Sequence, residues 1–345
     1  MIRKPVLLIS GAGGEIGHGL IERIADEGAY SVLALDLRPI EPDIAARCAD
    51  TIVGSILDTN LLERIASEYE IAGIFHLAAM LSTRGEFIPE TAHDINVQGT
   101  LNLLKFAVGE ARNAGTNVKF IFPSSIAVYG LPNVEQKERA GAVNEDQYLT
   151  PTTMYGVNKL ACEHLGRYYT HNYRQLAVDR DSFHVDFRSL RFPGLISAFT
   201  VPSGGTSDYA PEMLHAAARG ESYACFARPD TRIPFMAMPD AIDALMKLFN
   251  APAEWLSTTV YNVGSFSPSA EEIRLKTLDA FPEADITFEN DRRRQGILDT
   301  WPADVDDARA RADWGWAPAY DFSRAFDEYL IPNIRERYRG GVVSS

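Results

Sequence analysis

Tyr155 and Lys159 stand four positions apart and together offer acid–base chemistry. They lie in residues 152–174, whose pattern predicts a helix, so both side chains would project from one face of it. A lysine ammonium beside a phenol favours the phenolate, which allows the tyrosine to accept a proton near neutral pH. The Tyr-x-x-x-Lys spacing is common by itself, so its meaning depends on the segments around it.

Ser124 and Ser125 directly follow a predicted strand at residues 118–123. Ligands of open α/β folds bind at the carboxyl ends of the strands, so a hydroxyl group here could orient a substrate oxygen against Tyr155. The alternative is a turn serine that satisfies the backbone.

A glycine-rich loop, Ser10-Gly-Ala-Gly-Gly-Glu-Ile-Gly17, joins the first predicted strand to the first predicted helix. Gly11, Gly14 and Gly17 permit a tight turn, close approach of a pyrophosphate and close packing of helix on strand. The helix N-terminus then presents free N–H groups and a favourable dipole to the phosphates. The loop therefore predicts a dinucleotide site, although its spacing is Gly-x-x-Gly-x-x-Gly rather than Gly-x-Gly-x-x-Gly.

Asp36 ends the second predicted strand. A carboxylate at this position accepts hydrogen bonds from the ribose hydroxyls of adenosine and repels a 2′-phosphate. Asp36 thus favours NAD over NADP, while the nearby Arg38 is a feature that NADP would use. Two weaker signals follow later strands. Residues 54–58 stand where an adenine edge would lie, and residues 77–79 are small enough to lie beside the pyrophosphate; ordinary packing explains either equally well.

Other polar residues carry less information. His76 ends an apolar strand and is expected to be a hydrogen-bonded core histidine. The histidines show no metal-ligand spacing, and we expect no metal. Residues 291–294, Asp-Arg-Arg-Arg, are expected to form a solvated loop, with a contact to a substrate anion as the alternative.

Strands and helices alternate along the first two thirds of the chain, which predicts βαβ units and an α/β, doubly wound parallel sheet. Apolar runs predict strands at 4–10, 31–36, 51–55, 73–79, 118–123 and 185–192, and periodic segments predict helices at 15–27, 61–67, 93–113 and 152–174.

The alternation loosens after Pro193, where turn-rich sequence and short elements begin. We expect residues 1–193 and 231–263 to form the NAD-binding domain. Residues 194–230 and 264–345 are expected to form a smaller C-terminal substrate-binding region.

Composition restricts the partners of this chain. Its 345 residues carry a formal net charge of −14, which argues against binding to nucleic acid or to an anionic membrane. Three cysteines do not make a disulfide framework, and no apolar run approaches the ~20 residues of a membrane span. We expect a cytoplasmic enzyme with a small-molecule substrate.

Taken together, these motifs resemble the extended short-chain dehydrogenases/reductases of the NAD-dependent epimerase/dehydratase superfamily, which have a Rossmann-type fold. The resemblance implies that Ser125, rather than Ser124, is catalytic together with Tyr155 and Lys159. It implies an NAD site formed by Gly11, Gly14, Glu15, Ile16, Gly17, Asp36, Ser55, Ile56, Leu77, Ala78, Ala79, Asn96, Tyr155, Lys159 and Phe192. The substrate residues that it implies are Ser82, Ser125, Tyr155, Gly194, Thr206 and Asp208.

Within this superfamily the chain is most similar to the short-chain type of L-threonine 3-dehydrogenases. The matching stretches are residues 76–82, 153–159, 188–197, 204–210, 229–234, 238–240, 299–302 and 313–316. Relative to this family, residues 174–184 resemble an insertion between the helix at 152–174 and the next strand. The likeness implies NAD-dependent oxidation of the 3-hydroxyl of a small hydroxy amino acid, L-threonine to 2-amino-3-oxobutyrate, by a homodimer paired through the helices at 93–113 and 152–174. Nucleotide-sugar epimerases and dehydratases are an alternative, but they carry an asparagine shortly after the position of Arg191 that this chain lacks. A sugar-acid dehydrogenase and a non-catalytic dinucleotide sensor are further alternatives.

Overall fold

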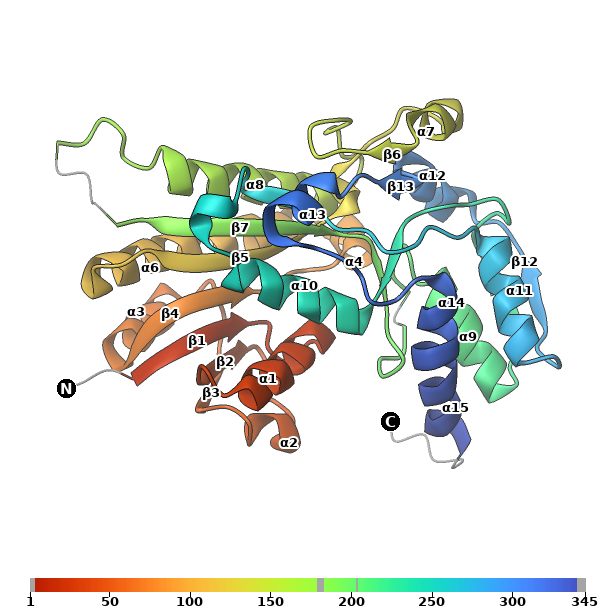
Figure 1. Cartoon of the computed structure of the whole chain (residues 1–345), viewed down its shortest axis with the longest axis horizontal. Helices are drawn as coiled ribbons and strands as arrows, with labels where there is room; N and C mark the ends of the chain where they lie inside the picture. The colour runs from red at the N-terminus through yellow and green to blue at the C-terminus, as the bar shows by residue number, and fades with distance from the viewer. Residues whose placement is uncertain (1–3, 179–182, 203, 340–345) are drawn as a thin grey trace.

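A seven-stranded sheet, parallel throughout, forms the centre of the molecule (Figure 1). The computed structural model describes residues 4–178, 183–202 and 204–339. In spatial order the strands are β11 (Val260–Asn262), β7 (Val185–Phe192), β5 (Val118–Ser125), β4 (Tyr69–His76), β1 (Lys4–Ser10), β2 (Val32–Asp36) and β3 (Asp50–Val53). The prediction of an α/β fold with a doubly wound parallel sheet is confirmed.

The register of the sheet brings the candidate site residues to one edge. Ser10 at the end of β1 pairs with His76 at the end of β4, and Ser125 at the end of β5 pairs with Phe192 at the end of β7. Because all strands run in one direction, the loops that follow them open on the same side. The glycine loop and the segments after Asp36, His76 and Ser125 therefore face a common space.

Helices cover both faces of the sheet. On one face α1 (Glu15–Glu27) and α10 (Met238–Asn250) enclose a core that includes Ile9, Leu20 and Leu245. On the other face α3 (Thr59–Glu68), α6 (Gly99–Ala114) and α8 (Met154–His171) enclose a second core. The helix predicted at 93–113 begins earlier. It runs continuously through α5 (Pro89–His93), a π-helical turn η1 (Asp94–Gln98) and α6.

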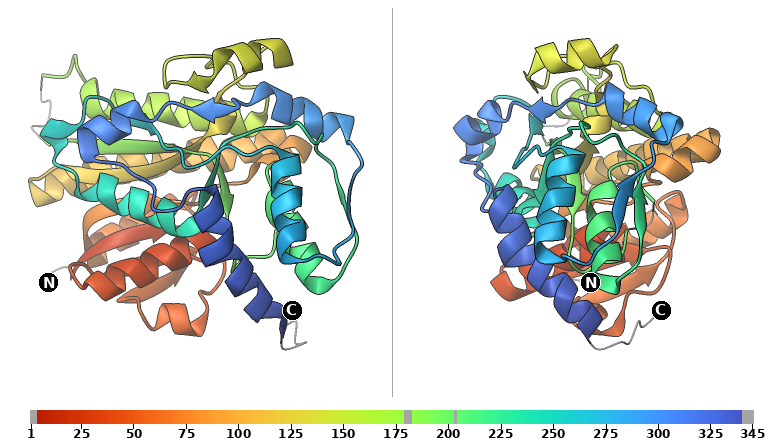
Figure 2. Two further views of the ribbon diagram at one scale, coloured as in Figure 1. Left: turned by 45° about the vertical axis from the view of Figure 1, so that its right-hand side comes forward. Right: turned by 90° about the vertical axis from the view of Figure 1, so that its right-hand side faces the viewer.

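Short elements lie beyond the carboxyl edge of the sheet, where α9, α11 and α15 gather side by side (Figure 2). The helices outside the two main layers are α2 (Pro42–Ala45), α4 (Ser82–Phe87), α7 (Val134–Ala140), α9 (Tyr209–Arg219), α11 (Ala270–Ala280), α12 (Arg292–Thr300), α13 (Ala308–Trp314), α14 (Phe322–Arg324), α15 (Ile331–Arg339), the 3-10 turns η2 (Ile126–Val128) and η3 (Ala253–Trp255) and the π-helical turn η4 (Ala325–Leu330). Three two-stranded sheets pair β8 (Gly194–Ile196) with β10 (Phe235–Ala237), β9 (Tyr223–Cys225) with β12 (Ile286–Phe288) and β6 (Ala142–Val143) with β13 (Asp304–Val305).

The segment 231–263 returns only in part to the main layers, since α10 packs on the sheet and β11 joins its edge, while β10 pairs with β8. The division into an NAD-binding domain (1–193 and 231–263) and a substrate-binding region (194–230 and 264–345) stays a prediction. Of the insertion predicted at 174–184, residues 179–182 lie outside the described part of the chain. No helix among the described residues is both long and apolar enough to span a membrane.

The expectation of a solvated loop at 291–294 is wrong, because α12 begins at Arg292. The Asp291 carboxylate caps this helix by accepting hydrogen bonds from the backbone N–H groups of Arg293 and Arg294. Aspartate is a preferred N-cap residue, so Asp291 is a sequence signal for the start of this helix. The three arginines that follow it indicate exposure to solvent and do not distinguish a helix from a loop.

Candidate active site

The glycine loop is built around two positions that tolerate no side chain. Gly11 has a left-handed backbone, with φ of 73°, and a Cβ atom there would lie 2.5 Å from the backbone nitrogen of Ala78. A Cβ atom on Gly17 would lie 2.3 Å from the carbonyl oxygen of Ala12. The loop therefore packs directly against the segment that follows β4, and α1 starts within it. This cradle fits a dinucleotide, because it leaves the N-terminus of α1, capped by Gly14 without any side chain, open to phosphate oxygens.

Asp36 is tied to the same loop. One carboxylate oxygen accepts a hydrogen bond from the Gly13 backbone N–H at 3.0 Å, and the other accepts from the Arg38 backbone N–H at 3.2 Å. The carboxylate is thus held at the end of β2, facing the glycine loop. The Arg38 side chain is exposed.

The other candidate cofactor residues lie at the neighbouring strand ends. The Ser55 hydroxyl accepts a hydrogen bond from the Leu57 backbone N–H, and Ile56 is buried against Gly99 of α6. Asn96 in η1 makes two hydrogen bonds to the backbone of Met80, at 2.7 and 3.0 Å, and so fixes the loop that carries Leu77–Ala79. Phe192 is buried at the end of β7.

Glu15 and Ile16 open α1 inside the glycine loop. Glu15 is half-buried, and burial raises the pKa of its carboxyl group, an effect opposed by the hydroxyl groups of Ser197 and Thr200. Its side chain therefore turns from the loop toward the segment after β8.

The two serines at the end of β5 have different partners. Ser124 is buried and donates a 2.5 Å hydrogen bond to the Glu163 carboxylate, away from the open edge. Ser125 is half-buried, and its hydroxyl oxygen accepts from the Ala127 backbone N–H at the start of η2. Ser125 consequently keeps a hydroxyl proton available for another partner, which supports its choice over Ser124.

Tyr155 and Lys159 lie on the first two turns of α8, which is capped by Thr153. The Lys159 ammonium lies 5.4 Å from the centre of the Tyr155 ring and donates a hydrogen bond to the Pro123 carbonyl oxygen at 2.6 Å. Since Pro123 precedes the serine pair, the helix and the end of β5 meet at this contact. The candidates Ser125, Tyr155 and Lys159 therefore belong to one small region.

Burial dominates the electrostatics of this pair. It raises the pKa of Tyr155 well above the ordinary value and lowers the pKa of Lys159 to about 8, while the nearby carboxylate of Glu163 opposes the fall. The free protein thus holds a neutral phenol, and ionisation of Tyr155 requires compensation by positive charge.

His76 has the structural role expected of it. Its ring nitrogens lie 2.7 Å from the Ser10 hydroxyl and 2.9 Å from the Thr100 hydroxyl. Burial and the Lys159 charge lower its pKa to about 3, so the imidazole is neutral at physiological pH. It joins β1, β4 and α6 beneath the site.

Two of the candidate substrate residues, Ser82 and Thr206, meet between α4 and the segment before α9. The hydroxyl oxygens of Ser82 and Thr206 are 3.4 Å apart, and the neighbouring Thr83 donates to the Gly204 carbonyl oxygen at 3.0 Å. Asp208 accepts from the Gly205 backbone N–H at 2.6 Å. Gly194, in β8, faces the Phe235 ring, which a Cβ atom there would approach to 2.7 Å.

Three contacts in this region were not anticipated. Glu86 of α4 accepts a hydrogen bond from the Met154 backbone N–H, next to Tyr155. Arg294 lies over the Phe226 ring, 3.2 Å from its centre, and donates to the Gly205 carbonyl oxygen at 2.8 Å. Each joins residues far apart in the chain, which no local pattern signals.

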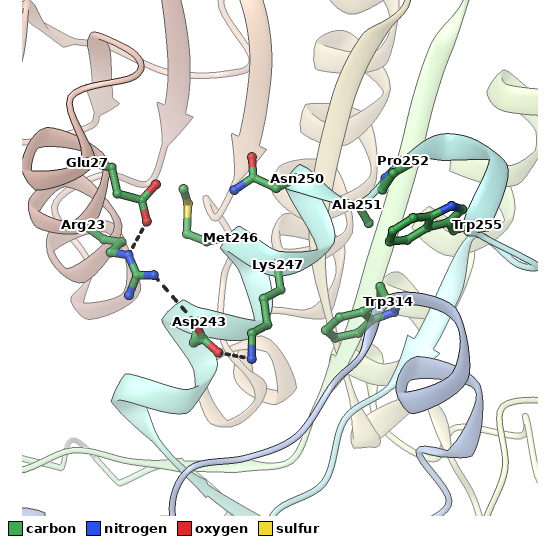
Figure 3. Close-up of a pocket in the computed structure, with 10 residues that line it drawn as sticks. All are labelled: Arg23, Glu27, Asp243, Met246, Lys247, Asn250, Ala251, Pro252, Trp255 and Trp314. Carbon is green, nitrogen blue, oxygen red and sulfur yellow. Dashed lines mark hydrogen bonds and ion pairs between the residues drawn. The ribbon is translucent and has the colours of Figure 1, made fainter.

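A groove of about 340 Å³ lies elsewhere, between α1, α10 and α13 (Figure 3). Trp255, Trp314 and Met246 form part of its wall. Arg23 of α1 pairs with Asp243 of α10, and Lys247 pairs with the same carboxylate from one turn further along α10. The residues that line it include none of the candidate site residues, so its location does not bear on the chemistry of Tyr155.

The fold and the glycine loop define a dinucleotide-binding α/β protein, and comparison with known proteins agrees. The model of the NAD dependent epimerase/dehydratase family matches residues 7–264. The mitochondrial L-threonine 3-dehydrogenase of Bos taurus is 34% identical over 316 residues, which cover 91% of this chain and 79% of that protein. The chain belongs to the NAD dependent epimerase/dehydratase family.

Two solved structures are also similar. A monomeric L-threonine 3-dehydrogenase from a metagenome, in its apo form, superposes with a TM-score of 0.83 at 36% identity, covering 96% of this chain and 99% of its own. The GalE-like L-threonine dehydrogenase of Cupriavidus necator, in its holo form, gives 0.82 at 34% identity, covering 96% and 100%. These similarities confirm the predictions that the protein is an enzyme, that its cofactor is NAD and that it has dehydrogenase activity.

Proposed function

We propose that this protein oxidises the 3-hydroxyl group of a small hydroxy amino acid, L-threonine above others, to the corresponding ketone, 2-amino-3-oxobutyrate. The observation that carries the proposal is the meeting of α8 and β5. Through the Lys159–Pro123 hydrogen bond, Tyr155, Lys159 and Ser125 share one region at the edge of the sheet. The similarity to proteins named L-threonine 3-dehydrogenase supports the choice of substrate.

The cofactor would be held by the glycine loop and Asp36, with the loop after β4 beside it. When bound, NAD supplies the acceptor for the hydride lost from the substrate carbon. Ser55 and Ile56, in the segment after β3, and Asn96 in η1 would complete the site. The carboxylate of Asp36 would accept hydrogen bonds from ribose hydroxyls.

Side chains of the protein accept the proton of the substrate hydroxyl and orient its oxygen. Tyr155, once ionised, accepts the proton of the substrate hydroxyl, and the Ser125 hydroxyl orients the same oxygen. The Lys159 ammonium favours the phenolate form of Tyr155, because opposite charges stabilise each other in a buried site. This positive charge counters the burial that otherwise keeps the phenol protonated.

The amino acid would lie under the contact between α4 and the 204–208 segment. Hydroxyl groups of Ser82 and Thr206 suit the substrate carboxylate, and the Asp208 carboxylate suits its ammonium group. Arg294 would hold this segment in place through the Gly205 carbonyl oxygen.

A substrate panel tests the proposal. Purified protein is incubated with NAD and L-threonine, other 3-hydroxy amino acids, 3-hydroxy acids without an amino group, or a UDP-sugar, and NADH is measured. We expect NADH with L-threonine and far less without the amino group. Turnover of the UDP-sugar with no net NADH would instead assign the protein to epimerisation.

We further propose that two copies pair through α6 and α8 and that the protein acts in the cytoplasm. Val157 and Tyr168 of α8 are exposed apolar side chains on a helix that would form such an interface. The three cysteines are free thiols, as a reducing compartment maintains them. Light scattering in solution tests the pairing, and a mass equal to one chain would exclude it.

A further inference from the structure

Glu163 continues the row of residues that begins with Tyr155 and Lys159. It follows Lys159 by one helical turn of α8 and is buried, with 2% of its surface exposed. The Ser124 hydroxyl donates to its Oε1 atom at 2.5 Å. Arg191 donates from Nε to Oε1 at 2.9 Å and from Nη2 to Oε2 at 2.6 Å.

The arginine that pairs with Glu163 is itself fixed. Arg191 of β7 is 2% exposed, and its Nη1 atom donates to the Tyr129 hydroxyl at 3.0 Å and to the Glu145 carbonyl oxygen at 2.8 Å. Tyr129 in turn donates to the Asn262 side chain of β11 at 2.7 Å. A carboxylate held in this way cannot move without breaking several buried hydrogen bonds.

Helix α8 therefore forms hydrogen bonds with two consecutive residues at the end of β5. Lys159 holds the carbonyl oxygen of Pro123, and Glu163 holds the hydroxyl of Ser124. The next residue is Ser125. Its backbone position, and with it the direction of its hydroxyl group relative to Tyr155, depends on both contacts.

We propose that Glu163 is a positioning residue for the reaction: it fixes Ser125 through Ser124 and supplies the negative charge that keeps Lys159 an ammonium ion. The effect on turnover rests on the proposed function, whereas the effect on Lys159 does not.

The surroundings of Lys159 support the proposed electrostatic effect of Glu163 on this lysine. The titratable groups that face it are Tyr155, Cys162 and Glu163 on α8 and His76 on β4. Burial raises the pKa of Cys162 to about 11 and lowers that of His76 to about 3, so both are neutral at pH 7. Glu163 is thus the carboxylate among these groups, and its removal lowers the pKa of Lys159 further below the value of about 8.

The test compares Glu163→Gln with a control at the ion pair of another arginine of β7. Asp186 also binds a buried arginine through two hydrogen bonds, to Nε and Nη2 of Arg188, which is 1% exposed. Asp186→Asn therefore removes a carboxylate that pairs with a buried arginine of β7, toward the end of the strand opposite Arg191. The Asp186 side chain is 18% exposed, against 2% for Glu163. Both variants are compared with the wild type by thermal unfolding, by NAD affinity and by turnover of L-threonine.

The expected result separates the two variants. In Glu163→Gln we expect kcat to fall on the order of tenfold to a hundredfold, as small misplacements of catalytic groups do, with the Kd for NAD little changed. Asp186→Asn keeps kcat near the wild-type value even if it unfolds at a lower temperature. The protonation of Lys159 is followed by NMR in protein without cofactor, with lysines labelled with ¹³C at Cε and the Lys159 signal assigned from its loss in Lys159→Arg. This signal should titrate at lower pH in Glu163→Gln than in the wild type.

Equal losses of kcat in Glu163→Gln and Asp186→Asn, or an unchanged Lys159 titration, would overturn the proposal. If Glu163→Gln does not fold, Ser124→Ala replaces it as the test, because it removes the hydrogen bond between Ser124 and Glu163 and leaves the ion pair with Arg191. An unchanged kcat in Ser124→Ala would contradict the positioning role of Glu163. If wild-type protein oxidises no hydroxy amino acid, the proposed function fails, and the Lys159 titration still tests Glu163.

Discussion

The Nζ atom of Lys159 donates a hydrogen bond to the carbonyl oxygen of Pro123 over 2.6 Å, although the residues are 36 positions apart. This bond joins the helix that carries Tyr155 to the strand that ends in Ser125. Lys159 therefore has two tasks, one electrostatic and one geometric. Its ammonium group also lies 4.5 Å from the centre of the Phe122 ring, so it contacts a second residue of β5.

Replacing Lys159 with methionine removes both tasks. We expect kcat to fall by about 10²–10⁴-fold, the usual contribution of positioned acid–base groups. Lys159→Arg keeps the positive charge but alters the shape of the side chain, so its activity should lie between that of Lys159→Met and that of the wild type. Steady-state kinetics with L-threonine measures both, and equal activity of the two variants would show that charge at this position does not matter.

Replacing Gly11 with alanine should abolish NAD binding, because the new Cβ atom would lie 2.5 Å from the Ala78 backbone nitrogen and displace the loop. Gly28 is the control. It has a similar positive φ of 66°, but nothing lies within 4 Å of a Cβ atom there. Gly28→Ala should lose only about 1–2 kcal/mol of stability and keep its NAD affinity. Calorimetric titration with NAD compares them; full affinity in Gly11→Ala would contradict the description of the cradle.

Replacing Asp36 with alanine should weaken NAD binding and improve the relative use of NADP. The substitution removes the acceptor for ribose hydroxyls and the charge that repels a 2′-phosphate, while Arg38 remains nearby. The measurement is the ratio of kcat/KM for the two cofactors. A ratio that stays at the wild-type value would assign cofactor choice to another residue.

Replacing Thr83 with valine should raise the KM for L-threonine with little effect on NAD affinity. Valine keeps the shape of the side chain but cannot donate to the Gly204 carbonyl oxygen, so α4 loses a bond to the 204–208 segment. Ser67→Ala serves as the control, since that exposed hydroxyl donates only to the Arg64 carbonyl oxygen on α3. An unchanged KM in Thr83→Val would mean that this contact does not shape the substrate site.

The pKa values predict how activity depends on pH. The active form needs ionised Tyr155, whose pKa is raised, and protonated Lys159, whose pKa is about 8. Below pH 8 the phenolate fraction grows about tenfold per pH unit while lysine stays charged; above pH 8 the loss of charged lysine cancels this gain. We expect kcat/KM to rise with pH and level off near 8, and Lys159→Arg to continue rising beyond it. A decline from pH 6 upward would contradict both assignments.

Much of the fold could be predicted because its causes are local. Apolar runs bounded by glycine and proline predict β1, β5 and β7, and the glycine loop predicts the start of α1. The predicted start of the fourth strand, at residue 73, is four residues later than the observed start. The strand starts at Tyr69, where no turn residue marks the end of α3.

The contacts that assemble the site could not be predicted in the same way. Thr83 and Gly204 are 121 positions apart, and Glu86 and Met154 are 68 apart, so no spacing in the sequence connects them. Glu163 is an intermediate case. Its distance of eight residues from Tyr155 places it on the same helix face, yet its partners Ser124 and Arg191 become visible only when β5 and β7 lie side by side.

The most direct test of the account compares wild-type protein with Tyr155→Phe in the NAD-dependent oxidation of L-threonine. Phenylalanine keeps the ring and removes only the group that accepts the proton. We expect NADH formation with threonine by the wild type and a loss of kcat of at least about 10²-fold in the variant, with NAD affinity retained. NADH formation by Tyr155→Phe at the wild-type rate, or none by the wild type with threonine, would contradict it.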